Sequence, residues 1–175
     1  DIGAVTRQGV ADLRPVQIST SQFESSPTQN VNLGVNLPAN DVISGSNGNN
    51  HDLTVEYFDN LGRVQVLTVR FAPNVPAVGD PPTNAWSVEV YDNSNGAEAL
   101  VATFSANFLD SRGNGGALNT VSNVEGYQLD ANGLPVLDAN GDPVVDGSLP
   151  GYDPDTGQIV INLPSGLVKF AVGRQ

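Results

Sequence analysis

The sequence contains no cysteine and no methionine, and it has one histidine, one tryptophan and, at Lys169, one lysine. The absence of cysteine excludes a disulfide framework and thiolate chemistry. No apolar run approaches the ~18 residues of a membrane-spanning helix, and the N-terminus carries no signal-peptide pattern. Because the chain begins with Asp1 and lacks methionine, we expect it to be a processed or excised piece of a longer protein.

Basic residues are also scarce, since 7 Lys and Arg face 19 Asp and Glu, for a net charge of −12. A charge of this sign and size repels nucleic acid and anionic membrane surfaces and favours solubility. With a single lysine, no basic patch is available to bind phosphate groups. We therefore expect neither nucleic acid nor membrane among the partners.

What the sequence has in abundance is glycine (19), proline (12), asparagine, aspartate and valine. This mixture argues against long helices and favours many short strands joined by turns. A chain of 175 residues is long enough to bury a core without covalent staples. The sequence therefore predicts an all-β protein, an antiparallel β-sandwich or β-barrel-like domain with many short strands and long loops.

The most informative segment runs from His51 to Trp86, and the strand that carries Trp86 continues to Tyr91. Residues 51–58 alternate in polarity, and Asp59-Asn60-Leu61-Gly62 has the composition of a tight hairpin turn, with Gly62 at the position that needs a positive φ. The return strand changes phase near Val66-Leu67, which indicates either a β-bulge or a strand buried on both faces. A proline-rich loop over 72–84 then leads to the strand that carries Trp86.

Further strands are expected on either side of this segment. Val31, Leu33, Val35 and Leu37 alternate with polar or small residues, which predicts a half-buried strand ending at Pro38. The remaining expected strands occupy 99–109, 158–163 and 167–172, and Leu13–Ile18 has the pattern of an edge strand.

A short tandem repeat follows the central strands: Leu129-Asp-Ala-Asn-Gly-Leu-Pro-Val and, directly after it, Leu137-Asp-Ala-Asn-Gly-Asp-Pro-Val. Two copies of eight residues are too few for a solenoid, so we expect successive turns in an extended excursion. The oxygens of 138–142 resemble the start of a calcium loop. The resemblance ends there, because Pro143 replaces the glycine and Leu149 replaces the bidentate glutamate, and we expect no metal site.

Few residues invite a catalytic interpretation. His51 has no second histidine or cysteine with which to bind zinc, and no Gly-x-Ser-x-Gly elbow accompanies it, so we expect a surface histidine. Carboxylates that could pair for glycoside hydrolysis sit in or beside expected turns. Trp86, with Tyr57 and Tyr91 nearby, could form a sugar-stacking platform, but it is in phase with Val88 and Val90 and is expected in the core.

Several of these motifs together resemble the outer β-domain of the bacterial flagellar hook protein family. The family pattern has a strand, a Tyr/Phe-Asp-Ser/Asn-x-Gly turn, a Leu-Thr-Val-x-Phe strand, a variable loop, and Asn-x-Trp-x-Val followed by Tyr. The matching segments here are Tyr57–Gly62, Leu67–Phe71 and Asn84–Tyr91, with weaker matches at 13–18, 32–38 and 129–133. The tandem excursion at 130–146 has no counterpart in the family pattern. The family's helical ends have no counterpart in this sequence.

The resemblance implies a structural, non-enzymatic protein without cofactors, located in the extracellular hook. Residues 1–27 would be a lead-in strand and linker from the neighbouring hook domain, and 28–175 the outer domain. Its partners would be neighbouring copies of the same subunit in a helical tube, and the fragment alone would be monomeric. The residues expected to form the core and its turn are Tyr57, Gly62, Val69, Phe71, Trp86 and Val88.

Three alternatives stay open at this point. A carbohydrate-binding or adhesin-type β-sandwich would expose Trp86 on a flat face. An all-β hydrolase would bring two carboxylates together in a cleft and raise the pKa of one of them. The related flagellar rod proteins are an alternative within the same class.

Overall fold

A computed structural model describes residues 25–113 and 115–174. The expected edge strand at 13–18 and most of the lead-in segment 1–27 lie outside these residues. The described chain forms eight strands and one short 3-10 helix, in the order β1 (Asn30–Asn32), η2 (Ala39–Val42), β2 (His51–Phe58), β3 (Val64–Pro73), β4 (Ala85–Asp92), β5 (Ala99–Phe108), β6 (Leu118–Gly126), β7 (Gln158–Leu163) and β8 (Gly166–Ala171).

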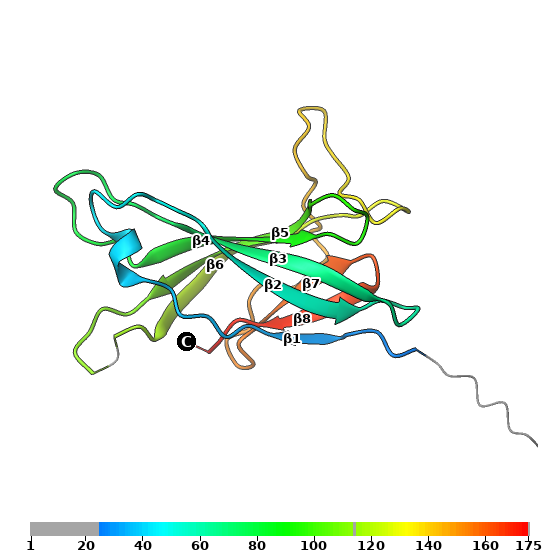
Figure 1. Cartoon of the computed structure of the whole chain (residues 1–175), viewed down its shortest axis with the longest axis horizontal. Helices are drawn as coiled ribbons and strands as arrows, with labels where there is room; N and C mark the ends of the chain where they lie inside the picture. Colours follow the sequence, from blue (N-terminus) through cyan, green and yellow to red (C-terminus); the bar gives the residue numbers. More distant parts are fainter. Residues whose placement is uncertain (1–24, 114, 175) are drawn as a thin grey trace, which may run out of the picture.

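The larger of the two sheets is an antiparallel meander of five strands in the order β2-β3-β4-β5-β6 (Figure 1). Its first connection is the predicted hairpin, in which Phe58 pairs with Val64 and Gly62 has a φ of 75°. Because each strand follows its neighbour along the chain, this sheet forms from local pairings.

The smaller sheet has the order β1-β8-β7 and is mixed. β7 and β8 form an antiparallel hairpin, whereas β1 pairs with β8 in parallel, with Asn30 opposite Lys169 and Asn32 opposite Ala171. This sheet therefore joins the start of the described chain to its end.

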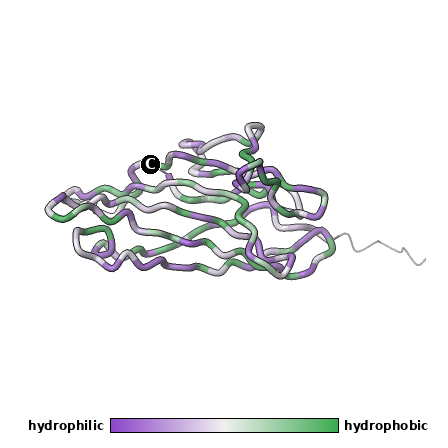
Figure 2. Tube along the Cα trace, turned by 90° about the horizontal axis from the view of Figure 1, so that it is seen from above, coloured by the Kyte–Doolittle hydropathy of each residue, from purple (hydrophilic) through white to green (hydrophobic). Residues whose placement is uncertain are grey.

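The two sheets pack face to face as a sandwich and do not close into a barrel. Hydrophobic and hydrophilic residues alternate along the strands, as Figure 2 shows, and the inward set forms one core. Ile159, Ile161 and Phe170 of the smaller sheet are 0% exposed and belong to the same core cluster as the inward residues of the larger sheet. The prediction of an all-β domain, either a sandwich or barrel-like, is confirmed, and the sandwich is the architecture found.

The phase change in β3 reflects burial on both faces and not a bulge. The register from His51–Phe71 to Phe58–Val64 is unbroken, and Leu67, Thr68 and Val69 are all buried. β3 lies inside the sheet, between β2 and β4. The register shifts occur instead where β5 pairs with β4 and with β6.

The strand predicted over 31–37 is shorter than expected. The strand ends at Asn32. The next residue, Leu33, still donates its backbone N–H to Ala171 O at 3.0 Å. Beyond that point β8 has ended and offers no partner, so the alternation of apolar residues continues without a sheet. Val35 is consequently 43% exposed.

The tandem repeat folds as predicted into successive turns, which project from the sandwich as the gold loops of Figure 1. Two small hairpins close through bridges from Leu129 to Pro135 and from Leu137 to Pro143. Backbone hydrogen bonds at the base form a closed ring of three: Val136 N to Gln128 O, Val144 N to Val136 O, and Gln128 N to Val144 O, at 2.8, 2.8 and 2.9 Å. We call residues 127–146 the arm.

Candidate functional site

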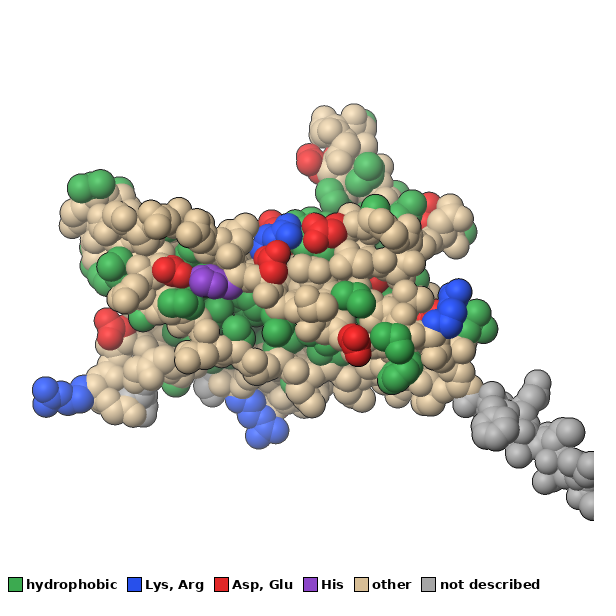
Figure 3. Space-filling view, viewed as in Figure 1, with side chains coloured by type: hydrophobic (Ala, Val, Ile, Leu, Met, Phe, Trp, Pro, Cys, Tyr) green, Lys and Arg blue, Asp and Glu red, His purple; other side chains and the backbone are tan. Residues whose placement is uncertain are grey.

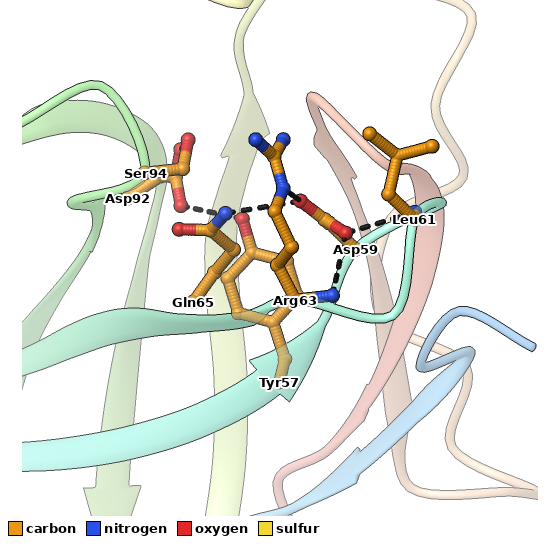
Figure 4. Close-up of polar contacts among 7 residues, drawn as sticks. All are labelled: Tyr57, Asp59, Leu61, Arg63, Gln65, Asp92 and Ser94. Atoms are coloured by element: carbon orange, nitrogen blue, oxygen red, sulfur yellow. Dashed lines mark hydrogen bonds and ion pairs between the residues drawn. The ribbon is translucent and has the colours of Figure 1, made fainter. Parts of the chain in front are cut away.

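The strongest concentration of polar contacts lies at one end of the larger sheet, where β2, β3 and β4 meet the hairpin turn (Figure 4). Tyr57 is 2% exposed, and its hydroxyl donates a 2.7 Å hydrogen bond to Oδ1 of Asp92, which is 1% exposed. The hydroxyl of Ser94 donates to the other carboxylate oxygen. Burial, followed by the hydrogen bond to Asp92, raises the pKa of Tyr57 well above its usual range, so the phenol remains a donor.

The second carboxylate of this cluster, Asp59, holds the hairpin turn. Its Oδ1 accepts the backbone N–H groups of Leu61 and Arg63, both at 2.9 Å. Its Oδ2 accepts from the side chains of Gln65 at 3.0 Å and Arg63 at 2.8 Å. The hydrogen bond from Gln65, with those from Arg63 and Leu61, holds the pKa of Asp59 far below its ordinary value.

This arrangement does not provide the acid and base that glycoside hydrolysis requires. A general acid needs a raised pKa, whereas the pKa of Asp59 is lowered. Asp92 is buried, and both of its oxygens accept hydrogen bonds from neighbouring hydroxyls. The adjoining depression of about 260 Å3 is open and is lined by Tyr57, Asp59, Arg63 and Ser94, among others. The polar cluster therefore fastens three strands and a turn to one another.

A larger groove of about 540 Å3 lies at the other end of the sheet, beside Trp86. Its lining is mostly apolar or amide, with contributions from Leu37, Val42 and Phe108, and in the described part of the chain Asp110 is its sole ionisable side chain. Trp86 is 2% exposed, so it offers no flat face on which a sugar ring could stack. The groove thus lacks both a catalytic pair and an aromatic platform.

The single histidine lies on the surface beside an acidic side chain (Figure 3). Its Nε2 is 2.6 Å from Oδ2 of Asp41, and its ring meets Trp86 edge-on with centroids 5.7 Å apart. Among the described residues, Asp41 is the one hydrogen-bond partner of the ring. His51 thus covers the edge of the buried indole and ties η2 to β2.

The aspartate at the second position of each repeat unit accepts hydrogen bonds within its own turn. Oδ1 of Asp130 accepts the N–H groups of Asn132 and Leu134, and Oδ1 of Asp138 accepts those of Asn140 and Asp142. These bonds to backbone donors lower the pKa of both carboxyls. Within residues 25–113 and 115–174, no three acidic or histidine side chains converge as metal ligands would.

The structure places the residues expected in the core and turn as follows. Tyr57, Val69, Phe71, Trp86 and Val88 are between 0% and 4% exposed, and Gly62 occupies the hairpin turn. Sequence reasoning missed the Tyr57–Asp92 bond, which joins residues 35 positions apart. No local pattern signals such a contact.

Comparison with known proteins adds no identification. No protein-family model matches the chain, and no curated protein matches it significantly. In the described residues no helix is long and apolar enough to cross a membrane.

Proposed function

We propose that this chain is a structural domain, the surface-exposed outer β-domain of a bacterial flagellar hook subunit. In this role the domain belongs to the short curved tube that joins the rotary motor to the filament and transmits torque while bending. The domain is extracellular, uses no cofactor, and has as its partners the same domain of neighbouring subunits in the tube. Isolated from the rest of the subunit, it is monomeric.

The observation that carries the proposal is the place of the hook-like segments in the fold and the contacts that their side chains make. The segments that resemble the hook family, 57–62, 67–71 and 84–91, form one continuous unit, the β2–β3–β4 meander with its hairpin. Most of their aromatic and aliphatic side chains lie in the core, with Phe58 and Leu61 exposed at the turn. Asp59 holds the hairpin turn, and Tyr57 is bonded to Asp92, the residue after the last segment. These contacts support a structural role for the segment, and not a catalytic one.

The surface supports weak contacts that can be remade. Exposed large apolar residues are distributed over separate loops and strand ends, among them Val78 at 95%, Leu61 at 73% and Leu137 at 57%. A stable interface concentrates apolar residues in one buried patch, whereas a bending tube needs small contacts that slide. The loop over 74–84 and the arm project furthest from the sandwich (Figure 1) and are the proposed contact elements.

Immunogold electron microscopy of the source bacterium tests the proposal. Antibodies raised against the purified chain are expected to label the hook, between cell body and filament, and to lose this labelling after absorption with the same chain. Labelling of the filament alone, of another surface structure, or of the cytoplasm would refute the assignment. A glycan array probed with the purified chain covers the binding-module alternative, for which reproducible binding of one sugar class would be the decisive result.

A further inference from the structure

The first and last strands of the described chain are hydrogen-bonded neighbours that run in the same direction. β1 and β8 pair in parallel, with Asn30 opposite Lys169 and Asn32 opposite Ala171. The chain therefore enters at one end of this strand pair and leaves at the other (Figure 1). Tension applied through the chain pulls β1 and β8 in opposite directions along their common axis.

The hydrogen bonds that join the two strands lie across this direction. Two of them flank the pairing, from Lys169 N to Gln29 O at 2.9 Å and from Leu33 N to Ala171 O at 3.0 Å. In a parallel pair the bonds are evenly spaced along the strands, so a sliding force loads all of them together. A force that opens a pair from one end loads them one after another.

Side-chain burial opposes the same movement. Val31, the central residue of β1, is 5% exposed, and its partner Phe170 is 0% exposed. Sliding β1 along β8 would withdraw Val31 from the core, which exposes apolar surface at the moment when the hydrogen bonds break.

Further hydrogen bonds hold the chain just outside each end of the β1–β8 pair. On the entry side, Thr28 N donates to Phe58 O at 3.0 Å, and Thr28 Oγ1 accepts from Phe58 N at 2.9 Å. On the exit side, Val172 N and Gly173 N donate to Gly157 O at 2.9 and 3.2 Å. The entering segment is therefore bonded to both sheets.

From this geometry we infer that β1 and β8, with the fastenings at Thr28 and Gly157, form a shear clamp that makes the domain resistant to tension along its own chain. The function is mechanical: the clamp must break before any other part of the sandwich can extend. The inference does not rest on the hook assignment, because it uses only the parallel pairing of β1 with β8 and the contacts around it.

Single-molecule force spectroscopy tests the clamp, and the absence of cysteine allows the second handle to be attached at a single introduced thiol. Both variants carry one handle at the N-terminus of the full chain. Arg174→Cys places the second handle beyond the end of β8, so that force shears the pair. Leu167→Cys, at a side chain that is 60% exposed, places it near the start of β8, beside the entry of β1, so that force peels the same strands apart.

The shear variant is expected to rupture at a force several-fold higher than the peel variant, although both unfold at the same denaturant concentration. Shear rupture should be one event that releases about 480 Å of chain, at roughly 3.4 Å per residue. Equal forces in the two geometries would overturn the inference. A separate rupture at low force, in which β1 detaches before the rest of the sandwich unfolds, would overturn it as well.

A matched pair of core substitutions separates the clamp from general stability. Val31→Ala and Val88→Ala remove the same two methyl groups from side chains that are 5% and 0% exposed. Both are expected to lower the denaturant midpoint, but only Val31→Ala should lower the shear rupture force substantially. If Val88→Ala lowers that force as much, resistance belongs to the whole core and the clamp is refuted.

Discussion

The buried bond between Tyr57 and Asp92 lends itself to a sharp stability prediction. Tyr57→Phe removes the hydroxyl and leaves Oδ1 of Asp92, at 1% exposure, without its 2.7 Å donor. Hydrogen bonds to charged groups contribute about 1.5–3 kcal/mol, and an unsatisfied buried partner adds to the loss. Because water cannot reach this carboxylate oxygen freely, we expect the substitution to lower the free energy of unfolding by about 2–3 kcal/mol.

Urea denaturation followed by circular dichroism at neutral pH measures this change directly. For a domain of this size, the expected loss corresponds to a fall in Tm of roughly 5–10 °C. Tyr91→Phe is the matched control, since the hydroxyl of Tyr91 donates to Glu89 at 2.8 Å from a half-buried position. There water replaces the lost partner, and we expect a change below about 1 kcal/mol.

A double-mutant cycle with Asp92→Asn shows whether the two side chains act on each other. A coupling energy of about 1 kcal/mol or more is expected for directly bonded groups. The reasoning is refuted if Tyr57→Phe costs no more than Tyr91→Phe, or if the effects of Tyr57→Phe and Asp92→Asn simply add.

Three further predictions follow from the turn and the core. Trp86 should emit at short wavelength and resist iodide quenching, because it is 2% exposed; red-shifted, quenchable emission would contradict its placement. Gly62→Ala should destabilise by about 1–2 kcal/mol, because Gly62 has a φ of 75° and a Cβ there would lie 2.9 Å from Ser25 Oγ. Gly34→Ala, in open space, is its control in urea denaturation and should change stability by less than about 0.5 kcal/mol. The folded-state pKa of Asp59 is below its unfolded value of about 3.9, so its stabilising contribution is present above that value and is lost as pH falls toward the folded pKa. Asp59→Asn should therefore lose less stability than the parent protein between about pH 5 and pH 2, and urea midpoints across this range that fall in parallel would contradict the assignment.

The sequence supports prediction best where structure is local. The hairpin at Asp59–Gly62 and the strand of Trp86 carry their signals within a few residues, and both occur in the structure. β6 was not anticipated, because Asn119, Thr120, Ser122 and Asn123 give it an exposed and mainly polar surface. Its strand conformation comes from pairing with β5, which no property of its own residues indicates.

The contacts of the polar cluster could not be predicted from the sequence for the same reason, because they depend on the pairing of segments that are separate along the chain. Tyr57 and Asp92 are brought together by two strand pairings, β2 with β3 and β3 with β4. Each residue alone has an ordinary interpretation, as a core aromatic and as a turn carboxylate. The parallel pairing of β1 with β8 depends in turn on residues that are far apart along the chain.

The ring of hydrogen bonds at the base of the arm links the geometry of the arm to the number of its eight-residue units. Gln128, Val136 and Val144 stand one repeat length apart. Val136 and Val144 each donate their N–H to the preceding member, and the N–H of Gln128 closes the ring on Val144 O. Two repeats supply two loops between these three positions, and the third gap is where the arm joins the domain. Deleting one repeat would leave two members and adding one would leave four, so neither change preserves the threefold closure. In this chain the number of repeats and the number of ring members therefore match, and a change in copy number would require the base of the arm to be rebuilt.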